Sequence, residues 1–76
     1  MNADEVLDCL GLYCPVPISE TARKIKSVAV GQVLEVLSDD EGIKLDMPAW
    51  CKATGNEFLG IEEEDGIFKA YVRRLR

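Results

Sequence analysis

The chain has no histidine, only three cysteines, and an aromatic content of 7% over its 76 residues. Without histidine, the chain can form neither a Cys-His catalytic dyad nor a histidine-ligated metal site. An odd number of cysteines does not suit the disulfide framework of a small secreted domain. We therefore expect free thiols, and we expect neither a metal nor a cofactor.

Long apolar runs are also absent. No run approaches the ~20 residues that cross a bilayer, and the opening MNADEVLD lacks the basic and apolar regions of a signal peptide. We therefore expect a cytoplasmic protein with no membrane attachment. Nine basic against fourteen acidic residues give a formal net charge of −5. This charge repels phosphate backbones, so we expect no direct nucleic-acid binding.

The residues that are present have the balance of an ordinary globular protein, with 47% hydrophobic and 30% charged. A chain of this length has room for one modest core. We found no linker, internal repeat or low-complexity tract, so we expect a single domain over residues 1–76.

The first half of the chain has the pattern of a strand, a helix and a second strand. Residues 5–10, EVLDCL, alternate like a strand with Leu7 and Cys9 on one face. A helix is expected over 17–30, where apolar residues recur at spacings of three and four. QVLEVL at 32–37 reads as a second, buried strand. This order predicts a parallel βαβ unit. The helical apolar residues are Ile18, Ala22, Ile25 and Val28.

A second helix is expected after this unit. Ser38 and Glu41 have the spacing of a capping box, which predicts a helix start near Asp40. Pro48 does not fit a helix interior comfortably. We therefore expect either a kink there or a restart of the helix, with Asp46 as the new cap.

The remainder of the chain is expected to form a hairpin. Gly55 supplies a helix stop, and the pair Asp65-Gly66 lies between two strand-like runs, which is a strong signal for a tight turn. The whole pattern is βαβαββ. It predicts an α/β (α+β) two-layer sandwich, with a four-stranded mixed sheet and both helices on one face.

The stretch GLYCPVPISE at 11–20 places Cys14 between the first strand and the first helix. A helix start carries free N–H groups and partial positive charge, which favour a thiolate, so we expect a mildly lowered pKa at Cys14. Pro15 and Pro17 restrict the backbone on the way into the helix. The sulfur is thus expected at a fixed place, with an activation of only a few-fold.

Two segments resemble a known family. LDCLGLYCPVP at 7–17 is similar to the Cys-Pro-x-Pro (CPxP) signature of the TusA/SirA-like sulfur carriers. SDDEGIKLDMPAWCKATGNEF at 38–58 is similar to the acidic start and the Asp-x-Pro-x-aromatic segment of the same family. The resemblance covers nearly the whole chain, in register and with the same order of elements.

The resemblance implies a sulfur carrier in which Cys14 holds sulfane sulfur as a persulfide. Pro15, Pro17, Asp8 and Gly11 would support it by shaping the turn. The implied partners are a protein sulfur donor, either a cysteine desulfurase or a rhodanese-like protein, and a protein sulfur acceptor. Such a chain is a sulfurtransferase-type carrier rather than a stand-alone enzyme. It would serve tRNA thiolation, molybdenum-cofactor supply or sulfur metabolism.

Two other readings stay open at this stage. Cys9 and Cys51 are expected in the core, but Cys9 is also a candidate resolving thiol, which would make the chain a thiol redox protein using Cys9 and Cys14. The βαβαββ order also suits a non-catalytic regulatory or binding module, in which Cys14 is dispensable.

Overall fold

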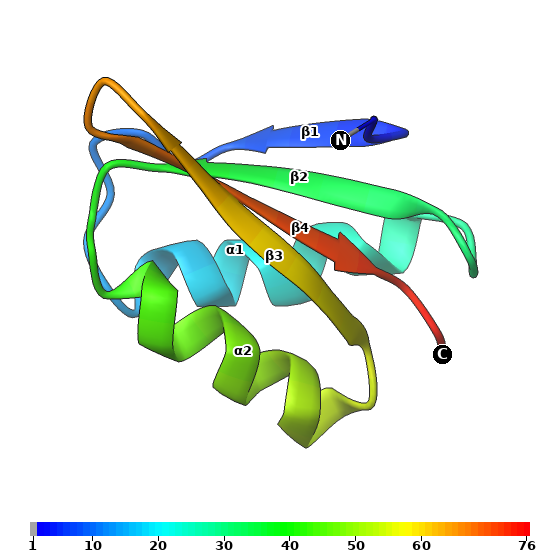
Figure 1. The fold of residues 1–76 in the computed structure, drawn as a ribbon. Helices are drawn as coiled ribbons and strands as arrows, with labels where there is room; N and C mark the ends of the chain where they lie inside the picture. The colour runs from blue at the N-terminus through cyan, green and yellow to red at the C-terminus, as the bar shows by residue number, and fades with distance from the viewer. Residues whose placement is uncertain (1) are drawn as a thin grey trace.

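The computed structural model describes residues 2–76 and has four strands in one mixed sheet, with two α-helices covering one face (Figure 1). The strand order is β1-β2-β4-β3, with β1 and β2 parallel and the other neighbours antiparallel. The predicted fold class is confirmed. The elements are β1 (Glu5–Asp8), α1 (Val16–Lys24), the 3-10 helix η1 (Ile25–Ser27), β2 (Val33–Ser38), α2 (Ile43–Thr54), β3 (Glu57–Glu64) and β4 (Ile67–Arg73).

The core lies between the sheet and the helices. Alternate residues of β2 and β4 point toward the helices, so that Leu34 and Val36 pair with Val72 and Ala70 in the buried layer. Met47 of α2 is fully buried against them. Burying a side chain of the size of Leu or Met stabilises the fold by ~1.5–3 kcal/mol. Of the helices in residues 2–76, none has the length and apolar character needed to cross a membrane.

The first βα unit differs from the prediction in its boundaries. Strand β1 ends at Asp8, although the N–H of Cys9 still donates to the carbonyl of Leu37 at 2.8 Å. Helix α1 begins at Val16, so Pro17 occupies its second position rather than the first. A proline is tolerated there because the first N–H groups of a helix have no intrahelical partner. The helix then tightens into η1 instead of continuing to the expected residue 30.

The expected capping box of α2 does not form. The helix begins at Ile43, its N-cap is Gly42, and no side chain among residues 2–76 caps it. The Ser38 hydroxyl instead accepts the N–H of Asp40 at 3.1 Å, because Ser38 is still the last residue of β2 and is fully buried. The Glu41 carboxylate lies 3.7 Å from Lys44, with which it forms an ion pair.

Pro48 lies inside a continuous helix, so the predicted restart with Asp46 as cap is wrong. Pro48 removes one backbone hydrogen bond from α2. The helix persists because Met47 and Cys51, on either side of the proline, are both buried against the sheet. Packing of an apolar helix face outweighs local propensity in such cases.

Both predicted turn signals are confirmed. Gly55 ends α2 in the left-handed conformation with φ of 78°, where a side chain would be strained. Asp65 and Gly66 connect β3 and β4 with φ of 53° and 77°. Two successive positive φ values are the hallmark of the tight hairpin turn that Asp-Gly favours.

Candidate functional site

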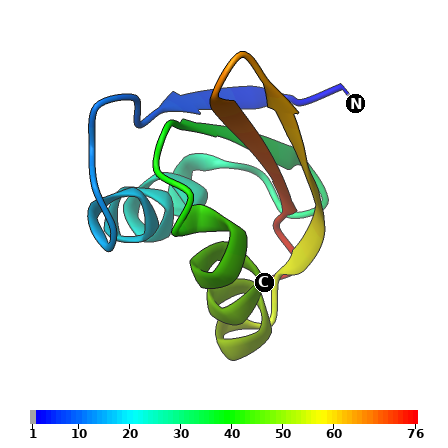
Figure 2. The same cartoon turned by 60° about the vertical axis from the view of Figure 1, so that its left-hand side comes forward.

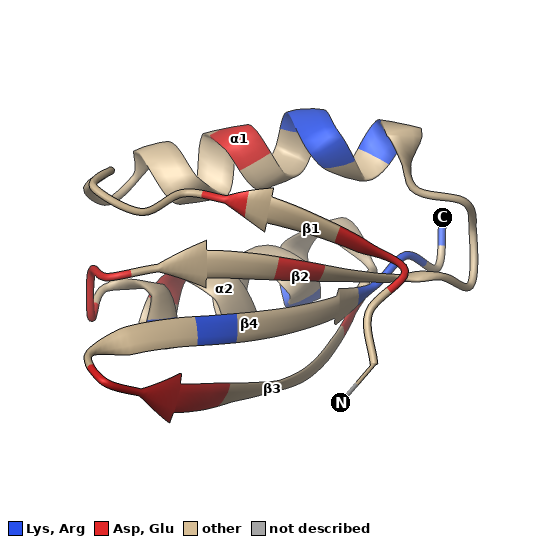
Figure 3. Ribbon diagram, turned by 90° about the horizontal axis from the view of Figure 1, so that it is seen from above, with Lys and Arg blue, Asp and Glu red and all other residues tan. Residues whose placement is uncertain are grey.

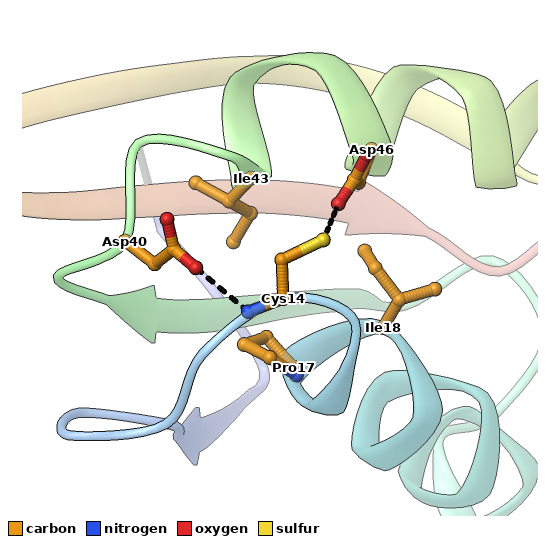
Figure 4. Close-up of a pocket in the computed structure, with 6 residues that line it drawn as sticks. All are labelled: Cys14, Pro17, Ile18, Asp40, Ile43 and Asp46. Carbon is orange, nitrogen blue, oxygen red and sulfur yellow. Dashed lines mark hydrogen bonds between the residues drawn. The ribbon is translucent and has the colours of Figure 1, made fainter.

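Cys14 lies in the loop between β1 and α1, at the surface. The loops that follow β1 and β2 leave the sheet at the same end, because the two strands are parallel, and each leads down to a helix (Figures 1 and 2). Cys14 therefore faces the start of α2 across a small, shallow pocket that is open to solvent. The peptide bond between Cys14 and Pro15 is cis. The pocket is lined by Cys14, Pro17, Ile18, Asp40, Ile43 and Asp46 (Figure 4).

Asp40 fixes the backbone of Cys14. Its carboxylate accepts the N–H of Cys14 at 2.7 Å and the N–H of Gly42 at 2.9 Å. These two backbone donors hold the pKa of Asp40 below its usual range. The neighbouring Asp39 accepts the N–H of Gly11 at 3.2 and 3.3 Å with its two oxygens. The adjacent carboxylates of Asp39 and Asp40, in the β2–α2 loop, thus bind the β1–α1 loop at two places, Gly11 and Cys14.

The thiol of Cys14 donates a hydrogen bond to the carboxylate of Asp46, which projects from the first turns of α2 (Figure 4). This bond raises the pKa of Cys14, and desolvation and the charges of Asp46 and Asp40 add to the rise. The expected lowering of this pKa by the start of α1 is therefore wrong. Cys14 precedes α1 by two residues and its sulfur points to α2, so the carboxylates outweigh the helix terminus.

The charge distribution agrees with this local picture. Figure 3 shows acidic residues gathered at the end of the sheet where β1 and β2 finish and where β3 turns into β4. Basic residues lie mainly at the far end of α1 and at the C-terminus (Figure 3). Cys14 is thus at the acidic end of the molecule.

The predicted supporting residues surround Cys14 in different ways. The carbonyl of Pro15 accepts the N–H groups of Ile18 and Ser19 at 3.0 and 3.1 Å, so Pro15 is the N-cap residue of α1. Pro17 is buried and forms one wall of the pocket. Asp8 and Gly11 precede Cys14 in the chain and lie outside the pocket lining.

The turn between β1 and Cys14 depends on these last two residues. The carboxylate of Asp8 accepts the N–H of Leu10 at 2.9 Å, and Gly11 takes the left-handed conformation with φ of 79°. They shape the turn and do not line the pocket around the sulfur.

Sequence reasoning missed the roles of Asp39, Asp40 and Asp46. The local pattern places Asp40 at a helix start and Asp46 at a possible cap, and neither position indicates a contact with Cys14. Asp40 and Asp46 bind Cys14 and Asp39 binds Gly11, so their partners lie 26 to 32 positions earlier in the chain. The only sequence signal was the cluster of acidic residues in one of the two segments that resemble the TusA/SirA-like family.

The family is established by comparison with known proteins. The sequence profile described as Sulfurtransferase TusA matches residues 5–74. This chain belongs to the TusA family. YrkF of Bacillus subtilis is 43% identical to this TusA-family chain over 74 residues, and the match covers 97% of the chain but only 40% of YrkF. The protein named sulfur carrier protein TusA in Allochromatium vinosum is 38% identical over 71 residues, with 93% of each protein covered.

The fold of this TusA-family chain also has a solved counterpart. A SirA-like protein from Desulfitobacterium hafniense superposes with a TM-score of 0.80, covering 95% of this chain and 99% of that one. Sequence identity is 19%, so this likeness concerns the fold alone.

The other two cysteines of this TusA-family chain are in the core, as predicted. Cys9 is fully buried and Cys51 is 1% exposed, and all three cysteines are free thiols. Burial raises the pKa of Cys51 to about 11. Burial also raises the pKa of Cys9, with Glu20 and Asp8 adding to the effect. Cys14 is the exposed thiol and the one that an incoming protein can reach.

Proposed function

We propose that this protein is a sulfur carrier, in which Cys14 receives sulfane sulfur as a persulfide and hands it to a second protein. In the loading step, the Cys14 sulfur attacks the outer sulfur of a donor persulfide. The new bond to Cys14 forms as the sulfur–sulfur bond of the donor breaks, and the proton of Cys14 ends on the departing donor thiol. Delivery repeats the exchange with the acceptor, so neither step needs an outside oxidant or reductant.

The observation that carries this proposal is the exposed sulfur of Cys14, held at a pocket between α1 and α2 by a loop anchored at Asp40. A carrier needs a thiol that a second protein can approach in line with the sulfur–sulfur bond. The naming of the Allochromatium vinosum relative as a sulfur carrier supports the same role here. The supporting residues are Pro15, Pro17, Asp8 and Gly11, which fix the path of the loop.

The partners in this proposal are proteins. The donor is a cysteine desulfurase or a rhodanese-like protein, and the acceptor presents its own thiol. The acidic end of the molecule around Cys14 favours a partner with basic side chains near its reacting sulfur (Figure 3). Two large exposed apolar side chains, Tyr13 at 76% and Leu45 at 80%, adjoin Cys14 and Asp46 in sequence and offer contact area.

The acceptor decides which pathway receives the sulfur: tRNA thiolation, molybdenum-cofactor supply or sulfur metabolism. Three free thiols suit a reducing compartment, so we place the relay in the cytoplasm. The protein acts with its donor and acceptor and is not a stand-alone enzyme in this proposal.

The test is intact-protein mass spectrometry after incubation with a cysteine desulfurase and cysteine, and in parallel with inorganic polysulfide. The wild-type protein should gain the mass of one sulfur atom, and a reductant should remove it. Cys14→Ser should gain nothing. Cys51→Ala is the matched control and should load like the wild type, because Cys51 is in the core.

Two results would contradict the proposal. If neither donor adds sulfur to the wild type while Cys14 is readily alkylated, Cys14 is not a sulfur acceptor. If the wild type loses two hydrogens and Cys9 becomes linked to Cys14, the thiol redox reading is correct instead.

A further inference from the structure

The unloaded thiol of Cys14 has a specific partner from a distant part of the chain. Asp46 is 32 positions away in the sequence, yet it accepts the hydrogen bond from the sulfur. Figure 4 shows the Asp46 side chain reaching across the pocket from α2 toward the sulfur, while Asp40 approaches the backbone nitrogen from the other side. The two carboxylates therefore do different things: Asp40 holds the main chain and Asp46 holds the reacting atom.

We propose that Asp46 is a positioning residue that holds the unloaded Cys14 as a protonated thiol, aimed at α2, so that the sulfur attacks a donor only when this contact is broken. The inference rests on the proposed function, since it concerns the same sulfur. A carboxylate that accepts from a thiol favours the neutral form of that thiol, because a thiolate beside it would meet like charge. The hydrogen bond to Asp46 therefore lowers the reactivity of the unloaded Cys14 toward oxidants and other small electrophiles.

Among the described residues that line the pocket around the sulfur, none carries a positive charge that would counter this contact. The pocket wall from α1 consists of Pro17 and Ile18, which are apolar. The wall from the β2–α2 loop adds Asp40, a second carboxylate. Helix α2 contributes Ile43 and Asp46. Every ionisable neighbour among these lining residues is therefore acidic, and the rise in the pKa of Cys14 has the same origin.

The experiment is the pH profile of Cys14 alkylation by iodoacetamide, followed by mass spectrometry, in wild type, Asp46→Asn and Asp46→Ala. In both variants the midpoint of the profile should move to lower pH, and alkylation at pH 7 should be about 3- to 10-fold faster. Above the midpoint the three rates should converge, because each protein then carries the thiolate. Asp46→Ala separates the loss of charge from any new hydrogen bond that the asparagine amide donates.

The matched control is Asp65→Asn, which removes one carboxylate from the β3–β4 turn. Asparagine tolerates the positive φ of 53° at this position, so the turn should be preserved. Its alkylation profile should coincide with that of the wild type. Thermal melts of all variants show whether a change in rate reflects unfolding, which would expose Cys9 and Cys51 to the reagent as well.

An unchanged midpoint in both Asp46 variants, or slower alkylation at neutral pH, would overturn the inference. Alkylation needs no sulfur donor, so this outcome is distinct from failure of the proposed function. If wild type accepts sulfur but the Asp46 variants keep the wild-type profile, the carrier role stands and the role of Asp46 does not. If wild type accepts no sulfur, the carrier role fails whatever the alkylation profile shows.

Discussion

The backbone N–H of Cys14 donates a hydrogen bond of 2.7 Å to the carboxylate of Asp40, and the second oxygen of the same carboxylate accepts the N–H of Gly42. One side chain thus joins the loop that carries the sulfur to the loop that starts α2. The position of the sulfur relative to Asp46 depends on this junction, since Asp46 lies one helical turn beyond Gly42.

Asp40→Asn should lower the melting temperature by a few degrees at pH 7. An amide can accept from only one of the two N–H groups, and it carries no charge. The pKa of Asp40 is lowered in the folded protein, so its contribution is fully present above its unfolded value of about 3.9 and is lost as the pH falls through the folded value. Melts followed by circular dichroism from pH 7 to pH 2.5 should show the difference in melting temperature between wild type and variant becoming smaller. A difference that stays constant with pH would contradict this role for Asp40.

Gly42→Ala should slow sulfur loading by about two- to tenfold with little change in stability. A Cβ at position 42 would lie 3.3 Å from the Cβ of Cys14 and 3.4 Å from Oδ1 of Asp40, so the loop must shift by a few tenths of an ångström. The φ of −55° is ordinary for alanine, so the backbone itself is not strained. Loading rates measured by mass spectrometry test this. Alkylation in denaturant is the control, because unfolded wild type and variant should react equally; equal loading rates in the native state would refute the prediction.

The fold could be predicted from the sequence because its signals are local and agree with one another. The β-branched and leucine-rich run of β2, the apolar stripe of α1 and the Asp65-Gly66 turn each specify one element, and the βαβ order limits how the elements can be arranged. The errors are at positions where tertiary packing overrides a local rule. Pro48 stays inside α2 because its neighbours are buried.

The site could be predicted only in part. The position of Cys14 could be predicted from the end of the first strand and from the two prolines. The protonation state of its thiol could not. That depends on Asp46, which α2 brings to the sulfur by folding against the same face of the sheet as α1. A sequence shows which helix follows a cysteine, and it does not show which residue of another helix faces it. The expected helix-start effect at Cys14 was therefore outweighed by a contact that has no local signal.

Tyr71→Phe should destabilise the protein by about 1 kcal/mol, which corresponds to ~4–8 °C in melting temperature. Tyr71 is 2% exposed although it lies on the face of the sheet away from the helices, and its hydroxyl donates to Glu62 at 2.8 Å. Burial, together with Glu62 and Glu35, raises the pKa of this phenol. Tyr13→Phe is the matched control: at 76% exposure its effect should stay within about 0.5 kcal/mol. Equal effects of the two substitutions would contradict the structural role of the Tyr71 hydroxyl.

Native alkylation at pH 8 should modify one cysteine, and alkylation in denaturant should modify three. Cys9 and Cys51 are buried and Cys14 is exposed, and reagents reach a buried thiol only after unfolding. Mass spectrometry counts the adducts, and Cys14→Ser should show none under native conditions. Native labelling of Cys14→Ser would mean that a second cysteine is accessible in the folded protein.

Cys51→Ala should reduce stability at pH 7 by ~1–2 kcal/mol and should make stability less dependent on alkaline pH. The pKa of Cys51 is raised to about 11 in the folded protein, whereas an unfolded cysteine titrates near 8.5. The buried thiol therefore contributes stability that is complete below about pH 8.5 and is lost as the pH rises toward the folded value, because the unfolded chain releases the proton first. Guanidinium unfolding at pH 7 and pH 10 should show the wild type losing more stability than the variant. Cys14 and Tyr71 titrate in both proteins, so their contributions cancel in this comparison. Equal losses of unfolding free energy in the two proteins would show that the Cys51 thiol does not control how stability falls at alkaline pH.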